Sequence, residues 1–160
     1  MRFALMLSLA LACTSAVASD PIVVVGKLIS NKPMDYVPDE CPANAICLRS
    51  WWRSAIDVEK TVAGQALSGR VDAAVMQHTG VNKQFKKNVR VFALRYIEDP
   101  AQRAKLRVDY YLDGMAEPQE FFCLGQDPAK LGLKTPRVYV SGEGDLAIHC
   151  FELPEARDSR

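Results

Sequence analysis

The feature that most constrains the fold is an alternation of apolar and polar side chains between Trp51 and His78. In its first half, apolar residues occupy even-numbered positions and charged residues odd-numbered ones. The apolar set is Trp52, Ile56, Val58 and Val62, and the charged set is Arg53, Asp57 and Glu59. A period of two is typical of a strand with one buried face and one solvated face. Gly64 and Gly69 separate this half from a second alternating half, so the stretch predicts a long β-hairpin.

Short apolar runs between turn residues predict the other strands. They are residues 22–29, 89–97, 106–112, 120–124, 137–141 and 146–153. Gly26 in the first run predicts a bulge or a bend. Asp99-Pro100 and Asp127-Pro128 each predict a helical turn, because an N-cap residue followed by proline starts a helix. We expect a mostly β domain over residues 19–153, folded as a partly closed barrel, which leaves few free strand edges.

A β-sandwich is the alternative for such a set of strands. The polar residues 154–160 are expected to form a flexible tail.

The first 18 residues have the organisation of a signal peptide. Arg2 supplies a positive charge, residues 3–12 are apolar apart from one serine, and Ala16-Val17-Ala18 fits a small-x-small cleavage site. The apolar core is shorter than the roughly 20 residues of a transmembrane helix, and no other run approaches that length. We therefore expect an exported protein, periplasmic or secreted, whose mature chain starts at or near Ser19.

A lipid anchor on Cys13 is the alternative. The preceding Leu9-Ala10-Leu11-Ala12 loosely resembles a bacterial lipoprotein signal, although Ala10 stands where a larger aliphatic residue is usual.

The balance of charges restricts which partners long-range electrostatic attraction could bring to the protein. Loss of Arg2 with the signal peptide leaves 19 basic residues against 19 acidic ones. A net charge near zero provides no long-range field that would steer nucleic acid or an anionic membrane to the protein. Any charged partner would therefore have to meet a local patch.

The cysteines agree with export. Cys41, Cys47, Cys123 and Cys150 remain after the signal peptide, an even number that suits an oxidising compartment. Of the three possible pairings we favour Cys41–Cys47, within a short loop, and Cys123–Cys150, between two late strands. Chain entropy predicts about 2 kcal/mol for the small loop and about 3.5 kcal/mol for the large one. Zinc is the alternative, but neither a CxxC nor a Cys/His pair at metal spacing is present, so we expect no metal or other cofactor.

Three segments together resemble the netrin-like module, which includes the tissue inhibitors of metalloproteinases. They are the apolar strand of residues 22–30, the stretch Lys60-Thr61-Val62-Ala63-Gly64 at the end of a long strand, and Phe122-Cys123-Leu124. The resemblance covers about residues 21–151 and implies an OB-type barrel with disulfides. Those inhibitors grip the protease zinc through an N-terminal cysteine. This chain has Ser19 at its expected start, so no inhibitory residue is carried over.

Two groups of residues are candidates for binding. One is a basic cluster with an aromatic inside it, formed by Lys83, Phe85, Lys86, Lys87 and Arg90. On an OB-type barrel such a loop could stack bases, but an exported protein rarely meets nucleic acid. An envelope glycan or an acidic partner protein fits better, and a solvated inter-strand loop is the simpler interpretation.

The other candidate is Trp51 with Arg53. Trp51 and Trp52 are adjacent on a strand and must face opposite ways, so one can be core while the other is partly exposed. Tryptophan beside arginine is typical of binding hot spots; a tryptophan that closes the barrel end is the alternative. By the same alternation, Tyr110 is expected in the core and Tyr111 on the surface.

Catalysis finds little support. His149 lies beside Cys150, but a Cys/His nucleophile would need that cysteine to be free. Ser141-Gly142-Glu143-Gly144 lacks the G-x-S-x-G pattern and a following helix. No catalytic residue is predicted.

The expected function is that of an exported, disulfide-stabilised domain that binds another protein or an envelope glycan, as an inhibitor or accessory protein of the bacterial envelope. The alternatives are a small periplasmic enzyme that uses His149 and a lipid-anchored structural component of the envelope.

Overall fold

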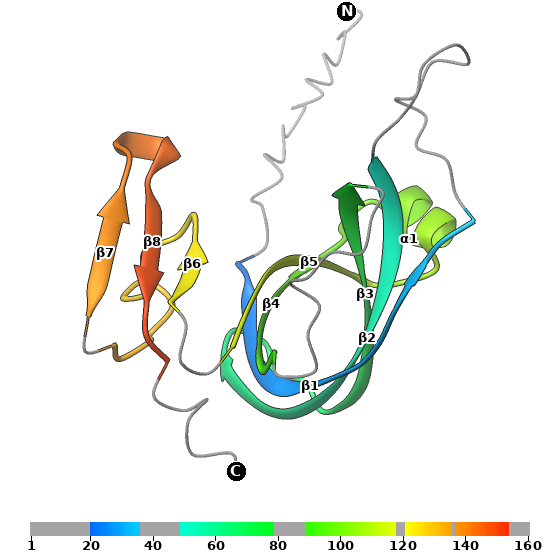
Figure 1. The fold of residues 1–160 in the computed structure, drawn as a ribbon, viewed down its shortest axis with the longest axis horizontal. Helices are drawn as coiled ribbons and strands as arrows, with labels where there is room; N and C mark the ends of the chain where they lie inside the picture. Colours follow the sequence, from blue (N-terminus) through cyan, green and yellow to red (C-terminus); the bar gives the residue numbers. More distant parts are fainter. Residues whose placement is uncertain (1–19, 36–48, 79–88, 118–120, 136, 154–160) are drawn as a thin grey trace, which may run out of the picture.

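The structure, a computed structural model, describes residues 20–35, 49–78, 89–117, 121–135 and 137–153 (Figure 1). Several predictions lie outside the described residues: the signal peptide with Cys13, the Cys41–Cys47 pair, the tail 154–160, and Lys83, Phe85, Lys86 and Lys87. The elements in chain order are β1 (Ile22–Pro33), β2 (Arg49–Ala63), β3 (Gly69–His78), β4 (Val91–Tyr96), α1 (Pro100–Leu106), β5 (Tyr110–Ala116), β6 (Phe122–Leu124), β7 (Val138–Ser141), the 3₁₀ helix η1 (Gly144–Leu146) and β8 (Ile148–Phe151).

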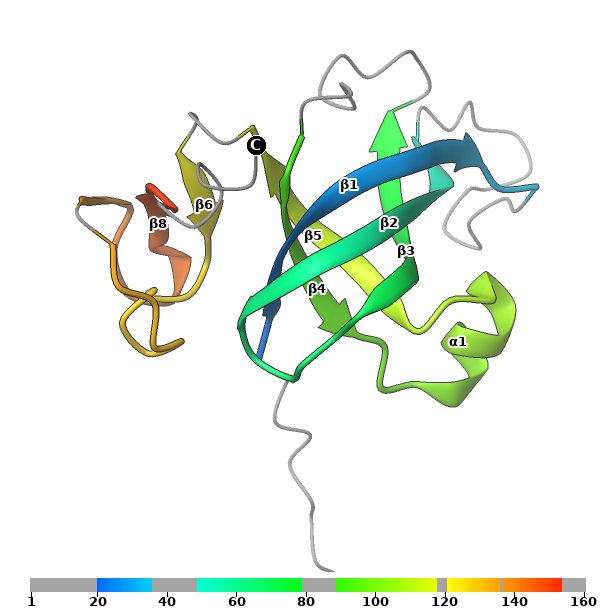
Figure 2. The ribbon, with the colours of Figure 1, turned by 90° about the horizontal axis from the view of Figure 1, so that it is seen from below.

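Five strands form a closed barrel in the order β1-β2-β3-β5-β4, with β4 pairing back to β1 (Figure 2). All neighbours are antiparallel except β3 and β5, which pair in parallel with Ala73 opposite Tyr110. This arrangement is compatible with an OB-like barrel and confirms the predicted mostly β fold. The predicted β2–β3 hairpin is also confirmed, and Gly64 and Gly69 in its turn both have positive φ.

Gly26 lies where the backbone of β1 passes close to that of β2. The pairing register of these two strands shifts between Val25 and Gly26, and a Cβ atom at Gly26 would lie 2.4 Å from the carbonyl oxygen of Asp57. The predicted irregularity is therefore confirmed. It has a structural use, because bulges let long strands bend tightly enough to close a small barrel.

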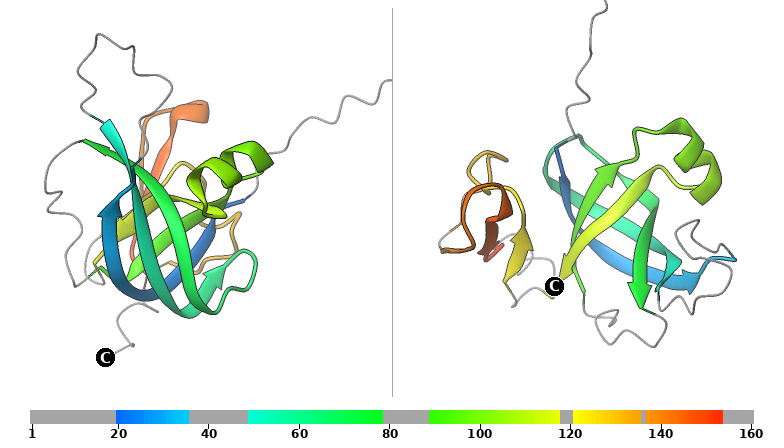
Figure 3. Two further views of the ribbon diagram at one scale, coloured as in Figure 1. Left: turned by 90° about the vertical axis from the view of Figure 1, so that its right-hand side faces the viewer. Right: turned by 90° about the horizontal axis from the view of Figure 1, so that it is seen from above.

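A second sheet of three strands, in the order β6-β8-β7, packs against the outside of the barrel. Cys123 on β6 stands directly opposite Cys150 on β8, and the two form a disulfide, as predicted. On the barrel-facing side, Phe122 and Phe151 are fully buried and meet edge-to-face at 5.9 Å. This sheet and α1 lie on opposite sides of the barrel (Figures 1 and 3).

The second sheet explains why residues 22–25 and 91–94 are apolar at every position. Alternate residues such as Val24 and Phe92 fill the barrel interior, while Val23 and Val91 face the buried aromatics of the small sheet. A strand covered on both faces has a continuous apolar sequence, as in other doubly covered sheets.

The helix α1 starts as predicted but ends later. The side chain of Asp99 caps it by accepting a hydrogen bond from the Ala101 N–H at 2.9 Å. The predicted strand over residues 106–112 is wrong: Leu106 is the last helical residue, and β5 begins only at Tyr110. The alternation misleads because Leu106 is buried under α1 outside the barrel, whereas Leu112 is buried inside it.

The second predicted helix start, at Asp127, forms a hydrogen-bonded turn in which the Ala129 N–H donates to the Asp127 carboxylate at 2.9 Å. A short 3₁₀ helix that the sequence did not predict, η1, lies between β7 and β8. No helix within the described ranges is long and apolar enough to cross a membrane.

Candidate binding surface

Two aromatic rings stack on the outer face of the barrel, beside α1. Trp51 comes from β2 and Tyr111 from β5, and their ring centroids lie 5.8 Å apart with planes 25° from parallel. Fully buried Ala74 on β3 belongs to the same apolar cluster, together with Ile97 and Leu106. Both rings are half-buried, so each packs on the protein and still presents surface to solvent.

A guanidinium extends this stack across the next strand. Arg95 on β4 stands opposite Tyr111, and its Cζ atom lies 4.8 Å from the centre of the tyrosine ring. Two of its nitrogens donate to the two carboxylate oxygens of Asp113, at 2.7 and 3.2 Å. That hydrogen bonding raises the pKa of Arg95 above its ordinary value, so the cation persists at every relevant pH. We name Trp51, Tyr111, Arg95 and Asp113 the Trp51 ladder.

Two contacts hold the Arg95 side chain in the Trp51 ladder. A forked Arg–carboxylate pair is a directional contact, and a guanidinium over an aromatic face gains further attraction. The Arg95 side chain nevertheless keeps 41% of its surface exposed. A partner would therefore meet a pre-ordered set of rings and charge on strands of the barrel.

Arg53 has a structural contact. Its Nη2 donates to the carbonyl of Leu106, the last residue of α1, at 3.2 Å. Cations are favourable at a helix C-terminus, where carbonyls lack partners within the helix. The buried Nε atom of Arg53 has no hydrogen-bond partner. Arg53 therefore joins the barrel to α1, next to the ladder.

Trp52 faces the opposite way from Trp51, as the alternation predicts. Its Nε1 donates to the hydroxyl of Ser50 at 2.8 Å. The two tyrosines divide likewise: Tyr110 packs on the interior cluster and Tyr111 on the outer one. Burial, helped by the neighbouring Asp109 and Tyr96, raises the pKa of the Tyr110 phenol.

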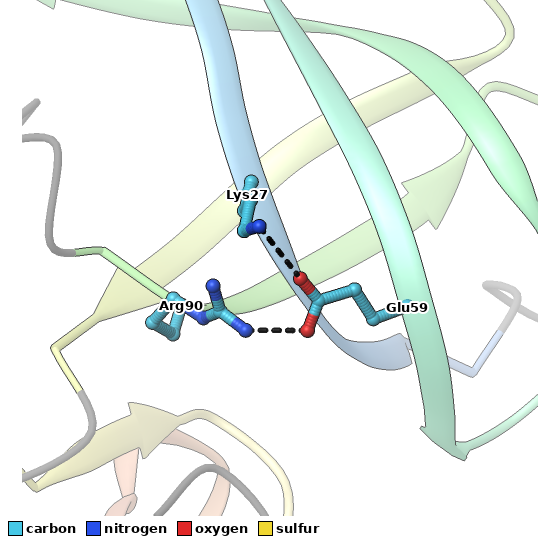
Figure 4. A network of polar contacts seen from close by, with 3 residues as sticks. All are labelled: Lys27, Glu59 and Arg90. Atoms are coloured by element: carbon cyan, nitrogen blue, oxygen red, sulfur yellow. Dashed lines mark hydrogen bonds and ion pairs between the residues drawn. The ribbon is translucent and has the colours of Figure 1, made fainter. Parts of the chain in front are cut away.

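Arg90 takes part in a different group of charges, shown in Figure 4. It forms an ion pair with Glu59, whose other carboxylate oxygen lies 3.8 Å from the Lys27 ammonium. Only 14% of the Arg90 side chain is exposed. Glu59 is eight residues from Trp51 along β2, roughly 25 Å at the usual rise of a strand. The structure therefore does not bring Arg90 next to the Trp51 ladder.

Sequence reasoning found Trp51 but missed Arg95 and Asp113. The alternation along β5 could have placed Asp113 on the outward face, because it lies two residues after Tyr111. What the sequence lacks is the pairing of β5 with both β3 and β4, which brings these side chains together.

The described residues offer little for catalysis. No group of three or more His, Cys, Asp or Glu among them could hold a metal ion. The sulfur of Cys150 is bonded to Cys123, so it cannot serve as a nucleophile beside His149. A pocket of about 580 Å³ lies between residues 127–135 and the start of β7. Its lining carries the polar residues Asp127, Lys134 and Thr135 and contains no histidine, cysteine or serine.

Comparisons of the chain with protein-family models, with curated proteins and with solved structures found no match. They therefore give no support to membership of the netrin-like module, and the closed barrel is compatible only with the OB-like fold that this resemblance implies.

Proposed function

We propose that this protein is an exported binding domain that recognises another protein through the Trp51 ladder. The observation that carries the proposal is the continuous contact from Trp51 through Tyr111 to Arg95 on one face of a closed barrel. Tryptophan, tyrosine and arginine are the residues enriched at the energetic centres of protein interfaces. Held in place beforehand, they lose little conformational freedom when a partner binds.

The charge of the ladder favours a protein over a polyanion. Asp113 neutralises Arg95 locally, so the surface presents a guanidinium without a net positive field. A phosphate-rich or sulfated polymer would instead need uncompensated cations. Trp51 lies on β2, and OB-type barrels bind oligonucleotides and oligosaccharides on the face of strands 2 and 3. This analogy supports the position of the binding surface, whereas the preference for a protein partner rests on the local charge balance.

Two features support export of this domain. Residues 1–18 have the pattern of a signal peptide, and Cys123 and Cys150 are joined. A disulfide persists in a compartment outside the reducing cytosol. We propose an accessory or inhibitory role in the bacterial envelope, carried out by a periplasmic or secreted protein.

Affinity capture from the organism's own cell envelope tests the binding surface. Arg95→Met keeps the aliphatic stem but removes the guanidinium, and we expect it to weaken capture of the partner about tenfold or more. Arg70→Met is the matched control, because Arg70 is also an exposed strand arginine paired with an aspartate, Asp72, at 3.8 Å. Trp51→Ala should weaken capture at least as much.

The outcomes separate the candidate surfaces. Equal capture by Arg95→Met, Trp51→Ala and the control would remove the ladder as the binding surface. Loss of capture in a Lys86→Ala/Lys87→Ala variant alone would assign binding to the basic loop. Release of a captured glycan by glycosidase would identify the other partner class.

Mass spectrometry of the mature N-terminus tests export. A start at or near Ser19 supports release after signal-peptide cleavage, and a diacylglycerol on Cys13 would show a lipid-anchored protein instead. An unprocessed chain with reduced cysteines in the cytosol would overturn the proposal.

A further inference from the structure

The strand β7 forms an open edge of the small sheet. It pairs with β8 on one side, and no described strand pairs with its other side (Figure 1). All four of its residues are exposed, including Tyr139 at 56% and Val140 at 58%. Every second residue of such an edge directs its N–H and C=O groups outward, where another strand can pair with them.

β7 is short, with four residues, but it lacks the other usual protections of an edge strand. Those protections are a charged residue, a proline or a bulge within the strand. Residues 138–141 are Val-Tyr-Val-Ser, a β-favouring sequence without charge or proline. The two valines lie on one face of the sheet, and on the other face Tyr139 meets Phe121 edge-to-face at 5.0 Å.

Charges at the two ends of β7 indicate what pairs with it. Arg137 precedes the strand and Glu143 follows it by two residues, both exposed. Neither forms an ion pair within the part of the chain that the structure describes. A second β7 running antiparallel would bring each Arg137 to the end that carries the partner's Glu143. A parallel copy would place like charges together, which is unfavourable.

We propose that this protein forms a two-fold symmetric dimer in which the β7 strands of two copies pair antiparallel and join the small sheets into one sheet of six strands. A pairing centred on Tyr139 sets the two tyrosines opposite each other and each Val138 opposite the partner's Val140. Aromatic and β-branched cross-strand pairs of this kind stabilise sheets. Such a two-fold contact uses the same patch on both copies and closes on itself.

The dimer is independent of the proposed function, because the small sheet and α1 lie on opposite sides of the barrel (Figure 3). Each copy would therefore keep its Trp51 ladder free. Two ladders on one particle would strengthen attachment to a partner that presents several binding sites.

Sedimentation of the mature protein tests the dimer. An edge contact is smaller than a standard interface, so we expect dissociation on the order of micromolar and a concentration series from about 5 to 500 µM. The wild type should approach twice the monomer mass at the upper end. Val140→Lys should weaken dimerisation about tenfold or more, because it places two ammonium groups in the edge contact. Ile29→Lys is the control, since Ile29 is an exposed strand isoleucine on the barrel.

Charge reversal tests the antiparallel direction. Arg137→Glu and Glu143→Arg should each weaken dimerisation, because each single change sets like charges at both ends of the contact. The double variant should restore it. A wild type that stays monomeric across the series would overturn the proposal, as would a dimer that Val140→Lys does not weaken. Failure of the double variant to recover would overturn the antiparallel pairing.

Discussion

Removal of the disulfide between β6 and β8 should lower the free energy of unfolding by an amount that follows from the length of the loop it closes. The bond closes a loop of 27 residues between Cys123 and Cys150. Without it the unfolded chain regains the entropy of that loop, which amounts to about 3.5 kcal/mol at 25 °C. For a domain of this size, that loss corresponds to a decrease in Tm of about 10–15 °C.

Removal of the disulfide should destabilise the barrel as well as the small sheet. Phe122 and Phe151 flank the two cysteines in sequence and are buried in the same cluster as Val23 and Val91 of the barrel. The small sheet therefore shares a core with the barrel, and the two parts should unfold together.

Urea denaturation of the Cys123→Ala/Cys150→Ala variant is the assay. Both tryptophans lie in β2, so their fluorescence reports on the barrel, while far-UV circular dichroism reports on both sheets. We expect one coincident transition, shifted to lower urea with an unchanged slope. A Cys41→Ala/Cys47→Ala variant is the comparison, and it should lose less, about 2 kcal/mol, because the loop closed by the predicted Cys41–Cys47 bond is shorter.

Two results would refute the reasoning. A loss under about 1 kcal/mol in the Cys123/Cys150 variant would show that loop entropy does not govern its stability. Separate fluorescence and dichroism transitions would show that the small sheet unfolds without the barrel.

Three further changes test other parts of the structure. Gly26→Ala should destabilise the protein by about 2–3 kcal/mol in urea denaturation, because the new Cβ would meet the Asp57 carbonyl oxygen at 2.4 Å; a neutral result would mean that β1 and β2 separate easily there. Burial raises the pKa of Tyr110, so the folded state retains the phenol proton at a pH where the unfolded chain has lost it. Stability should therefore be complete below the ordinary tyrosine pKa of about 10 and fall above it, and Tyr110→Phe should reduce that alkaline loss in denaturation series. Glu59→Gln should cost about 1 kcal/mol through its contact with Arg90, and 1 M salt should shrink the difference from wild type.

Local patterns in the chain were enough for most elements. The alternation in residues 51–78 predicts the β2–β3 hairpin, Gly26 predicts the irregularity in β1, and Asp99 predicts the start of α1. Each of these follows from interactions between residues close in sequence or from the period of a strand. The even number of cysteines predicts disulfides, and the places of Cys123 and Cys150 on two late strands favour the bond between them.

The same patterns misplaced the start of β5 and did not show that β6, β7 and β8 form a sheet of their own. Leu106 and Leu112 fit one alternation, although they are buried in different clusters on opposite faces of the barrel wall. The spacing of apolar residues indicates that a side chain is buried. It does not indicate which part of the structure covers that side chain.

By itself, the sequence determined the strand-rich class, the turns and the cap of α1, and it favoured the Cys123–Cys150 pairing. Tertiary structure alone decided which strands became neighbours, and with that the contact of Trp51, Tyr111 and Arg95 and the open edge at β7. The reason is physical. Strand pairing joins residues far apart in the chain, and its register depends on how every other strand is packed.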